Sequence, residues 1–264
     1  KAFTLKSADG RMKGEISTDG GIRYSLTPDD VLLLENSGLS MSLTDGTVYG
    51  GPDSKLRRAR IGSANRTVKA VAYKKAEVRE NYNELTLEYR GFKVIFRAYD
   101  DACAYRFVSL SDKPFIVKDE QADFRFPEDR TAYIPYIHKK WKGSLEEILE
   151  NDFQCPYTHS LLSEWNERYS IAPLLVECPE GKKVVITEAD LMNYPGMFLY
   201  NYKKGNGETL SGYFARVPDK TEIGGHNMVQ EKRDSRKEYI AECPPFEKVP
   251  WRVGAGSSSD KELT

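Results

Sequence analysis

The sequence contains no apolar run long enough to cross a bilayer. A membrane-spanning helix needs roughly 20 consecutive apolar residues, whereas the longest apolar stretches, such as residues 31–34, have the length of a single strand. We therefore expect no membrane span.

An excess of charge of either sign is also missing. The 39 Lys and Arg residues nearly cancel the 40 Asp and Glu residues, which leaves a formal net charge of −1. Nucleic-acid binding depends on a surplus of cations that neutralise phosphates. The balance of charge argues against a nucleic-acid partner.

Residue types that bind transition metals are scarce. The 4 cysteines lie far apart and show no C-x-x-C spacing, which argues against a zinc or redox motif. We expect buried, unpaired cysteines, with a disulfide as the alternative: Cys103, Cys155, Cys178 and Cys243. The 3 histidines belong to no motif, so we expect surface or hydrogen-bonded side chains: His138, His159 and His226.

Alternating strands and tight turns are abundant instead. An Asp-Gly-Gly turn at residues 19–21 separates two short runs, which predicts a hairpin over residues 13–26. Apolar and polar residues alternate over residues 85–90 and 92–98, and again over residues 104–108. This period of two predicts three half-buried strands in an antiparallel meander.

The rest of the chain continues this pattern with one exception. Further strands are expected at residues 171–177, 183–188 and 210–215, separated by Gly and Pro turns. Residues 144–150 predict a single short helix, with Ser144 as its N-cap. The Gly/Ser-rich residues 254–259 predict a flexible linker or tail.

So many strands over about 250 residues predict an all-β fold. We expect one large antiparallel sandwich of two sheets, with two smaller sandwiches as the alternative. Neighbouring carboxylates are expected to be solvated charges rather than catalytic pairs: Asp29 and Asp30, Asp100 and Asp101, Glu146 and Glu147.

Three segments resemble the N-terminal domain of glycoside hydrolase family 97. Residues 96–107 are similar to a hairpin of sugar-processing super-sandwich domains, and residues 249–253 contain the Pro-Trp-Arg that closes the family's domain. The most specific match is residues 185–199, where TEADL is followed by YPGM. The resemblance extends over essentially the whole chain.

The resemblance implies a galactose mutarotase-like β super-sandwich over residues 1–252. Residues 253–264 would form a Gly/Ser-rich linker or tail, where a catalytic barrel would begin. The implied parent enzyme acts on α-glucosides or α-galactosides, with a catalytic barrel and a C-terminal domain in the same polypeptide. Such enzymes are periplasmic or secreted bacterial proteins. No catalytic residue is then expected in this chain.

The resemblance also implies that this domain lends one glutamate to a calcium ion, and the matching position is Glu188. Calcium takes 6–8 oxygen ligands, so one carboxylate alone would leave calcium absent or weakly bound. The alternative is that Glu188 pairs with an arginine or caps a turn. Asp190 and Asn193 are candidate substrate-binding residues, or they fix the turn through hydrogen bonds to the backbone.

Two other functions stay open. A stand-alone carbohydrate-binding module would bind oligosaccharides on exposed aromatic rings, for which Trp141, Trp165 and Trp251 are candidates. A mutarotase-like epimerase would use a histidine acid with a glutamate base.

Overall fold

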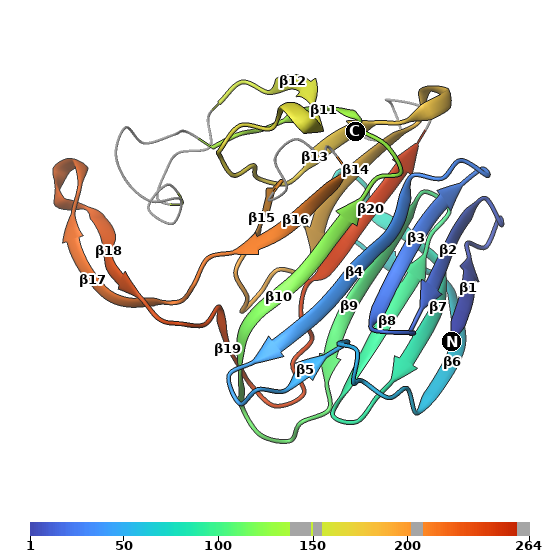
Figure 1. Cartoon of the computed structure of the whole chain (residues 1–264), viewed down its shortest axis with the longest axis horizontal. Helices are drawn as coiled ribbons and strands as arrows, with labels where there is room; N and C mark the ends of the chain where they lie inside the picture. Colours follow the sequence, from blue (N-terminus) through green and yellow to red (C-terminus); the bar gives the residue numbers. More distant parts are fainter. Residues whose placement is uncertain (138–148, 150–154, 202–207, 258–264) are drawn as a thin grey trace.

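The computed structural model describes residues 1–137, 149, 155–201 and 208–257, which form two large antiparallel sheets packed face to face (Figure 1). The first sheet has a main path in the order β1-β2-β3-β4-β10-β16-β15, with β5 added to β4 and β19 added to β10. Its strands are β1 (Ala2–Lys6), β2 (Met12–Ser17), β3 (Ile22–Pro28), β4 (Leu34–Leu43), β5 (Val48–Tyr49), β10 (Phe115–Arg125), β15 (Met197–Tyr200), β16 (Thr209–Phe214) and β19 (Ala241–Cys243).

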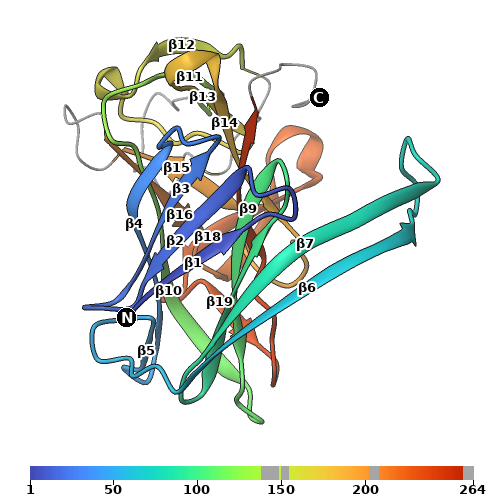
Figure 2. The ribbon, with the colours of Figure 1, turned by 90° about the vertical axis from the view of Figure 1, so that its right-hand side faces the viewer.

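The second sheet runs in the order β12-β11-β13-β14-β20-β9-β8-β7-β6. Its strands are β6 (Arg58–Lys69), β7 (Glu77–Glu88), β8 (Phe92–Ala98), β9 (Ala102–Ser109), β11 (Thr131–Ile134), β12 (Thr158–Leu161), β13 (Leu174–Glu177), β14 (Lys183–Ala189) and β20 (Trp251–Ser257). The β6–β7 hairpin extends beyond the body of the sandwich (Figure 2).

A third, two-stranded sheet forms an arm that projects from the other side of the molecule (Figure 1). It consists of β17 (Pro218–Gly224) and β18 (Gln230–Arg236). Helical structure in the described residues is limited to three 3-10 turns, η1 (Leu162–Glu164), η2 (Pro179–Gly181) and η3 (His226–Met228). No helix in this part of the chain is long and apolar enough to cross a membrane.

The alternation read from the sequence places the core between the two sheets. In β8, Phe92, Val94 and Phe96 are buried while their neighbours are partly exposed. One continuous apolar cluster joins residues from both sheets, from Leu5 to Val249. The single large sandwich is therefore confirmed, and the alternative of two smaller sandwiches is wrong.

Most of the predicted strands are confirmed. The hairpin at residues 13–26 is β2 paired with β3, and β7, β8 and β9 form the predicted antiparallel meander. All 4 cysteines are unpaired as expected, although Cys155 and Cys178 are only partly buried. The predicted helix at residues 144–150 lies outside the described residues apart from Leu149, as do His138 and Trp141.

The expected linker is wrong for residues 253–257, because β20 lies in the middle of the second sheet between β14 and β9. The glycines there serve close packing rather than flexibility. A Cβ on Gly254 would lie 3.4 Å from Leu26, and a Cβ on Gly256 would lie 3.3 Å from Leu33. Residues 258–264 lie outside the described part of the chain.

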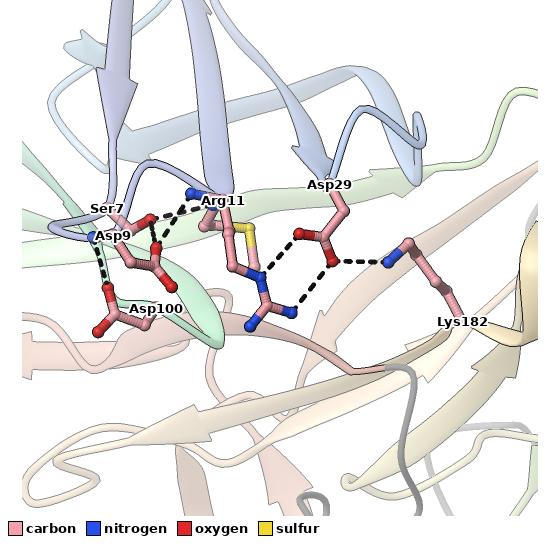
Figure 3. Close-up of polar contacts among 7 residues, drawn as sticks. Ser7, Asp9, Arg11, Asp29, Asp100 and Lys182 are labelled. Carbon is pink, nitrogen blue, oxygen red and sulfur yellow. Dashed lines mark hydrogen bonds and ion pairs between the residues drawn. The ribbon is translucent and has the colours of Figure 1, made fainter.

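A polar network joins the two sheets at one end of the sandwich (Figure 3). Asp29, in the turn after β3, accepts hydrogen bonds from Arg11 Nε at 2.8 Å and from Lys182 Nζ at 2.7 Å. Asp100, between β8 and β9, accepts a hydrogen bond from the backbone N–H of Asp9 at 3.1 Å. Asp29 is therefore an exposed turn carboxylate as expected, and it is in addition paired with Arg11 and Lys182.

These hydrogen bonds, first from Arg11 and then from Lys182, hold the pKa of the Asp29 carboxyl well below its usual range. Because the pKa of Asp29 is lower in the folded state than in the unfolded state, this contribution to stability is present above the unfolded pKa, about 4. It is lost as the pH falls through the folded pKa.

Replacing Asp29→Asn should lower the free energy of unfolding at pH 7 by about 1 kcal/mol, since the ion pairs are partly exposed. Asn tolerates the left-handed backbone at this position, where φ is 45°. The difference from wild type should shrink as the pH is lowered below about 4. Urea unfolding at several pH values measures both effects, with Asp30→Asn in the same turn as the control. A difference that does not depend on pH would contradict the assignment.

Candidate functional site at the end of strand β14

The pairing of β14 with β20 places Glu188 directly opposite Arg252. Val184 and Ile186 of β14 point into the core, and the period of two gives Glu188 the same direction. Glu188 is the last inward-facing residue of this strand, and its side chain is 13% exposed. The strand therefore brings a carboxylate to the margin of the core.

Arg252 forms a buried ion cluster that crosses the sandwich. Its side chain is 0% exposed and donates to both oxygens of Glu120 on β10, from Nε at 2.8 Å and from Nη2 at 2.7 Å. Its Nη1 donates to Glu188 Oε2 at 2.8 Å. The guanidinium carbon also lies 4.7 Å from the centre of the Phe214 ring. One arginine thus links the first sheet, the second sheet and Glu188.

The cluster contains two carboxylates and one guanidinium. Burial acts to lower the pKa of Arg252, but the carboxylate of Glu120 outweighs it and raises that pKa above its usual value. Close by, burial raises the pKa of the Tyr194 hydroxyl well above its usual value, and the Glu120 carboxylate beside it acts in the same direction.

The turn after β14, residues 190–196, closes back on Glu188; we name it the Glu188 turn. The backbone N–H of Met197 donates to Glu188 Oε1 at 2.9 Å. A Cβ on Gly196 would lie 3.4 Å from the same oxygen, so glycine permits this close approach. Glu188 therefore accepts one hydrogen bond on each oxygen, from the Met197 N–H on Oε1 and from Arg252 on Oε2.

Asp190 lies in the Glu188 turn with a left-handed backbone (φ 60°) and pairs with Arg106 Nη1 at 3.0 Å. Arg106 also donates to the carbonyl oxygens of Val249 at 2.8 Å and Lys248 at 2.9 Å. Arg106 therefore ties the turn to the segment that leads into β20. Asn193 is exposed and lines two hollows of about 420 and 260 Å³.

The described tryptophans offer little free surface to a sugar ring. The guanidinium groups of Arg97 and Arg106 lie 4.6 and 4.9 Å from the centre of the Trp251 ring. Trp165 is buried and donates from its ring N–H to the carbonyl oxygen of Arg168 at 3.0 Å. Both side chains are committed to packing, which disfavours a carbohydrate-binding module built on them.

Comparison with known proteins places this geometry in a family. The family model described as glycosyl-hydrolase 97 N-terminal matches residues 5–264. The chain belongs to glycosyl-hydrolase family 97. A retaining alpha-galactosidase from Bacteroides thetaiotaomicron is 38% identical over 265 residues; the match covers 100% of this chain and 40% of that protein. This family 97 chain therefore spans about two fifths of the length of that relative.

Solved structures support the fold. A family 97 enzyme from Pseudoalteromonas sp. strain K8, in complex with acarbose, aligns with a TM-score of 0.73 and 16% identity over 97% of this chain and 36% of that one. A beta-arabinopyranosidase aligns with a TM-score of 0.77 and 20% identity over 97% of this chain and 40% of that one. At these identities, the likeness establishes the super-sandwich and nothing about the reaction.

The family 97 domain places the predicted residues in different roles. Glu188 pairs with Arg252 and also accepts a hydrogen bond from the backbone N–H of Met197 at the end of the turn. Pairing with an arginine was the alternative to the role of metal ligand. Asp190 fixes the turn through Arg106 rather than through the backbone. Asn193 is available at the surface. Whether any of the three contacts calcium or sugar stays a prediction.

Sequence reasoning missed Glu120, Arg106 and Arg252. Glu120 occupies a buried position in the alternation of β10, with Ala122 and Phe124 continuing the same inward face. A carboxylate at such a position has to be paired. The signal that could have revealed the cluster was this inward-facing glutamate in β10, taken together with an arginine in β20, a strand of mostly small residues.

A histidine–glutamate pair is present but does not suit an epimerase. His159 Nε2 lies 3.1 Å from Glu177 Oε2, and the His159 ring stacks on Tyr133 with 4.2 Å between ring centres. The two groups hydrogen-bond each other at the surface, which leaves no room for a pyranose between the acid and the base. This arrangement disfavours the mutarotase-like alternative.

Glu188 fits a calcium site in part. A carboxylate has about four acceptor positions, so two hydrogen bonds leave acceptor capacity on Glu188. The absence of a side chain at Gly196 also leaves space beside Glu188 Oε1, because a Cβ there would lie 3.4 Å from that oxygen. However, no group of three or more His, Cys, Asp or Glu in the described residues could hold a metal ion. A calcium ion beside Glu188 would therefore need ligands in addition to those of the described residues.

Replacing Arg252→Met should lower the free energy of unfolding by about 3–5 kcal/mol, because it leaves two carboxylates buried without a cation. Glu188→Gln should cost less, about 1–3 kcal/mol, because the amide nitrogen of Gln cannot accept one of the two hydrogen bonds that the Glu188 oxygens accept. The double variant Glu120→Leu with Arg252→Met should recover part of the loss. Urea unfolding measures all three, with the exposed Arg60→Met as the control. Equal losses in the Arg252 and Arg60 variants would contradict this interpretation.

Proposed function

We propose that this domain completes the sugar pocket of a larger family 97 glycoside hydrolase and lends Glu188 to a calcium ion at that pocket. The proposal is carried by one observation: the Glu188 carboxylate is 13% exposed at the end of β14 and is held by Arg252 and by the backbone N–H of Met197. Glu188 is the partly exposed member of the cluster, so it is the carboxylate that a neighbouring group can reach.

The domain's own residues position the Glu188 carboxylate. Arg252 holds one oxygen, the backbone N–H of Met197 holds the other, and Glu120 keeps Arg252 in place from the opposite sheet. Arg106 fixes the turn that follows through Asp190. Calcium, when bound, would supply electrostatic stabilisation and orient substrate oxygens. The carboxylate is therefore preorganised before the rest of the enzyme contributes its ligands.

We propose an α-galactoside as the substrate class, with α-glucosides as the second candidate. The 38% identical relative is a retaining alpha-galactosidase, and all of this chain aligns with 40% of that protein. The catalytic acid and base would lie in the part of the polypeptide beyond this domain, as would the other calcium ligands. A periplasmic or secreted location stays a prediction.

The chain of 264 residues should be catalytically silent on its own. Given an aryl α-galactoside or an aryl α-glucoside, it should release no more phenol than buffer does, because hydrolysis needs two suitably spaced carboxylates across the sugar. The full-length enzyme, assayed in parallel, should hydrolyse at least one of them. Measurable turnover by the 264-residue chain would contradict an accessory role.

In the full-length enzyme, Glu188→Gln should weaken calcium binding at least tenfold, since an amide is neutral and a poorer ligand than a carboxylate. Calorimetric titration of the chelator-treated enzyme with calcium measures the affinity directly. Glu177→Gln, which changes a partly exposed glutamate on the neighbouring strand β13, is the matched control. Unchanged affinity in the Glu188 variant would remove this residue from the calcium site.

A further inference from the structure

A hollow lies where the β6–β7 hairpin leaves the second sheet. β7 pairs with β6 from Glu77 to Glu88, but with β8 only from Asn83 to Glu88. Among the described strands, residues 77–82 of β7 are therefore paired on one side only, and the hairpin separates here from the body of the sandwich (Figure 2). The hollow between the hairpin and the body has a volume of about 630 Å³.

This hollow lies at the end of β20 that is remote from Glu188. Gly256 lines it. Gly256 pairs with Val184 at the start of β14, whereas Arg252 pairs with Glu188 at the end of the same strand. The rest of the lining comes from the hairpin and from the turns between β1 and β2 and between β8 and β9. Glu188 and its proposed calcium do not account for this hollow.

The body side of the hollow presents carboxylates. Asp100 and Asp101, in the turn between β8 and β9, are exposed and line it. Asp100 accepts the backbone N–H of Asp9 on Oδ1 at 3.1 Å (Figure 3) and the side-chain amide of Asn81 on Oδ2 at 3.4 Å. A carboxylate has about four acceptor positions, so Asp100 is fixed in place and still has acceptor positions for the hydroxyl groups of a ligand.

The hairpin side presents cations. Four cationic side chains line the hollow, and three of them come from the hairpin: Arg11, Lys74, Lys75 and Arg79. Arg79 donates to Asn65 Oδ1 at 3.3 Å, and within the described residues neither Arg79 nor Lys75 forms an ion pair. Cations form strong hydrogen bonds with carboxylates, so these two side chains suit an anionic group of a ligand.

Two tyrosines complete the lining. Tyr73, in the turn of the hairpin, is 57% exposed, and Tyr99 packs against the Tyr82 ring with 5.2 Å between ring centres. An aromatic ring presents a large apolar face, which can pack against the C–H groups of a sugar ring. Aromatic faces, carboxylates and cations therefore meet in one hollow.

We infer that this hollow binds an acidic saccharide, a sugar chain whose rings carry carboxylate groups. The rings pack on the two tyrosines, the ring hydroxyls donate to Asp100 and Asp101, and the sugar carboxylates pair with Lys75 and Arg79. A nucleic acid fits less well, because its closely spaced phosphates would be repelled by the two aspartates. This binding activity goes beyond the proposed role of Glu188 and does not depend on it.

Calorimetric titration of the full-length enzyme with trigalacturonic acid tests the inference. The carboxyl-reduced trisaccharide, which keeps the ring hydroxyls but carries no charge, is the matched ligand. The acidic trisaccharide should bind at least tenfold more tightly than the reduced one, because only the acidic one can pair with Lys75 and Arg79. Equal affinities, or no binding of the acidic trisaccharide, would overturn the inference. Acetate that binds as tightly as the acidic trisaccharide would reduce the hollow to an anion site and would overturn it as well.

A double variant locates the bound trisaccharide. Tyr73→Ala with Arg79→Gln should weaken binding of trigalacturonic acid at least tenfold. Both side chains are exposed, so the changes remove no core packing. Tyr157→Ala with Arg60→Gln is the matched control, since it changes an exposed tyrosine and an exposed arginine that do not line the hollow. Wild-type affinity in the first variant, or an equal loss in the control, would contradict a site in this hollow.

The outcome is separable from that of the calcium experiment. Glu188→Gln should leave the affinity for trigalacturonic acid unchanged, because Glu188 lies at the other end of β20. A tenfold loss of affinity in that variant would place the trisaccharide at the Glu188 end of the domain and overturn the inference. Unchanged calcium affinity in Glu188→Gln would reject the metal role and leave the saccharide site in place.

Discussion

A guanidinium withdrawn from water has to be matched by carboxylates, and Arg252 is matched by two. Glu120 approaches it from the first sheet with both oxygens, and Glu188 approaches from the neighbouring strand with one. Because a buried arginine without its partners would be very costly, the two sheets, β20 and the end of β14 are constrained together. The position of the Glu188 carboxylate depends on this cluster.

The cluster also explains why Glu188 is suited to a shared site. Its two oxygens are held by a side chain and by a backbone N–H, so the carboxylate has little rotamer freedom left to lose on binding a further group. The Glu188 turn is held in addition by the ion pair between Asp190 and Arg106.

At another end of the sandwich, the two sheets are joined by ion pairs that are less buried than the Arg252 cluster. Arg11, Asp29 and Lys182 lie in turns, and their ion pairs are partly exposed. Solvent screens such pairs, so they contribute modestly to stability. The buried cluster fixes the Glu188 carboxylate, whereas the partly exposed network holds turns of the two sheets against each other.

The sequence by itself determined the class of fold and the family. Period-two alternation predicts strands because side chains point to alternate faces, and the TEADL and YPGM segments carried the family resemblance. Local pattern failed at residues 253–257, where glycines that read as a linker pack beneath Leu26 and Leu33 in a central strand. Only the tertiary structure paired Glu120 with Arg252 across 132 positions and brought Arg79 and Asp101 to one hollow. Contacts between distant segments depend on how the sheets stack, and no local pattern records that arrangement.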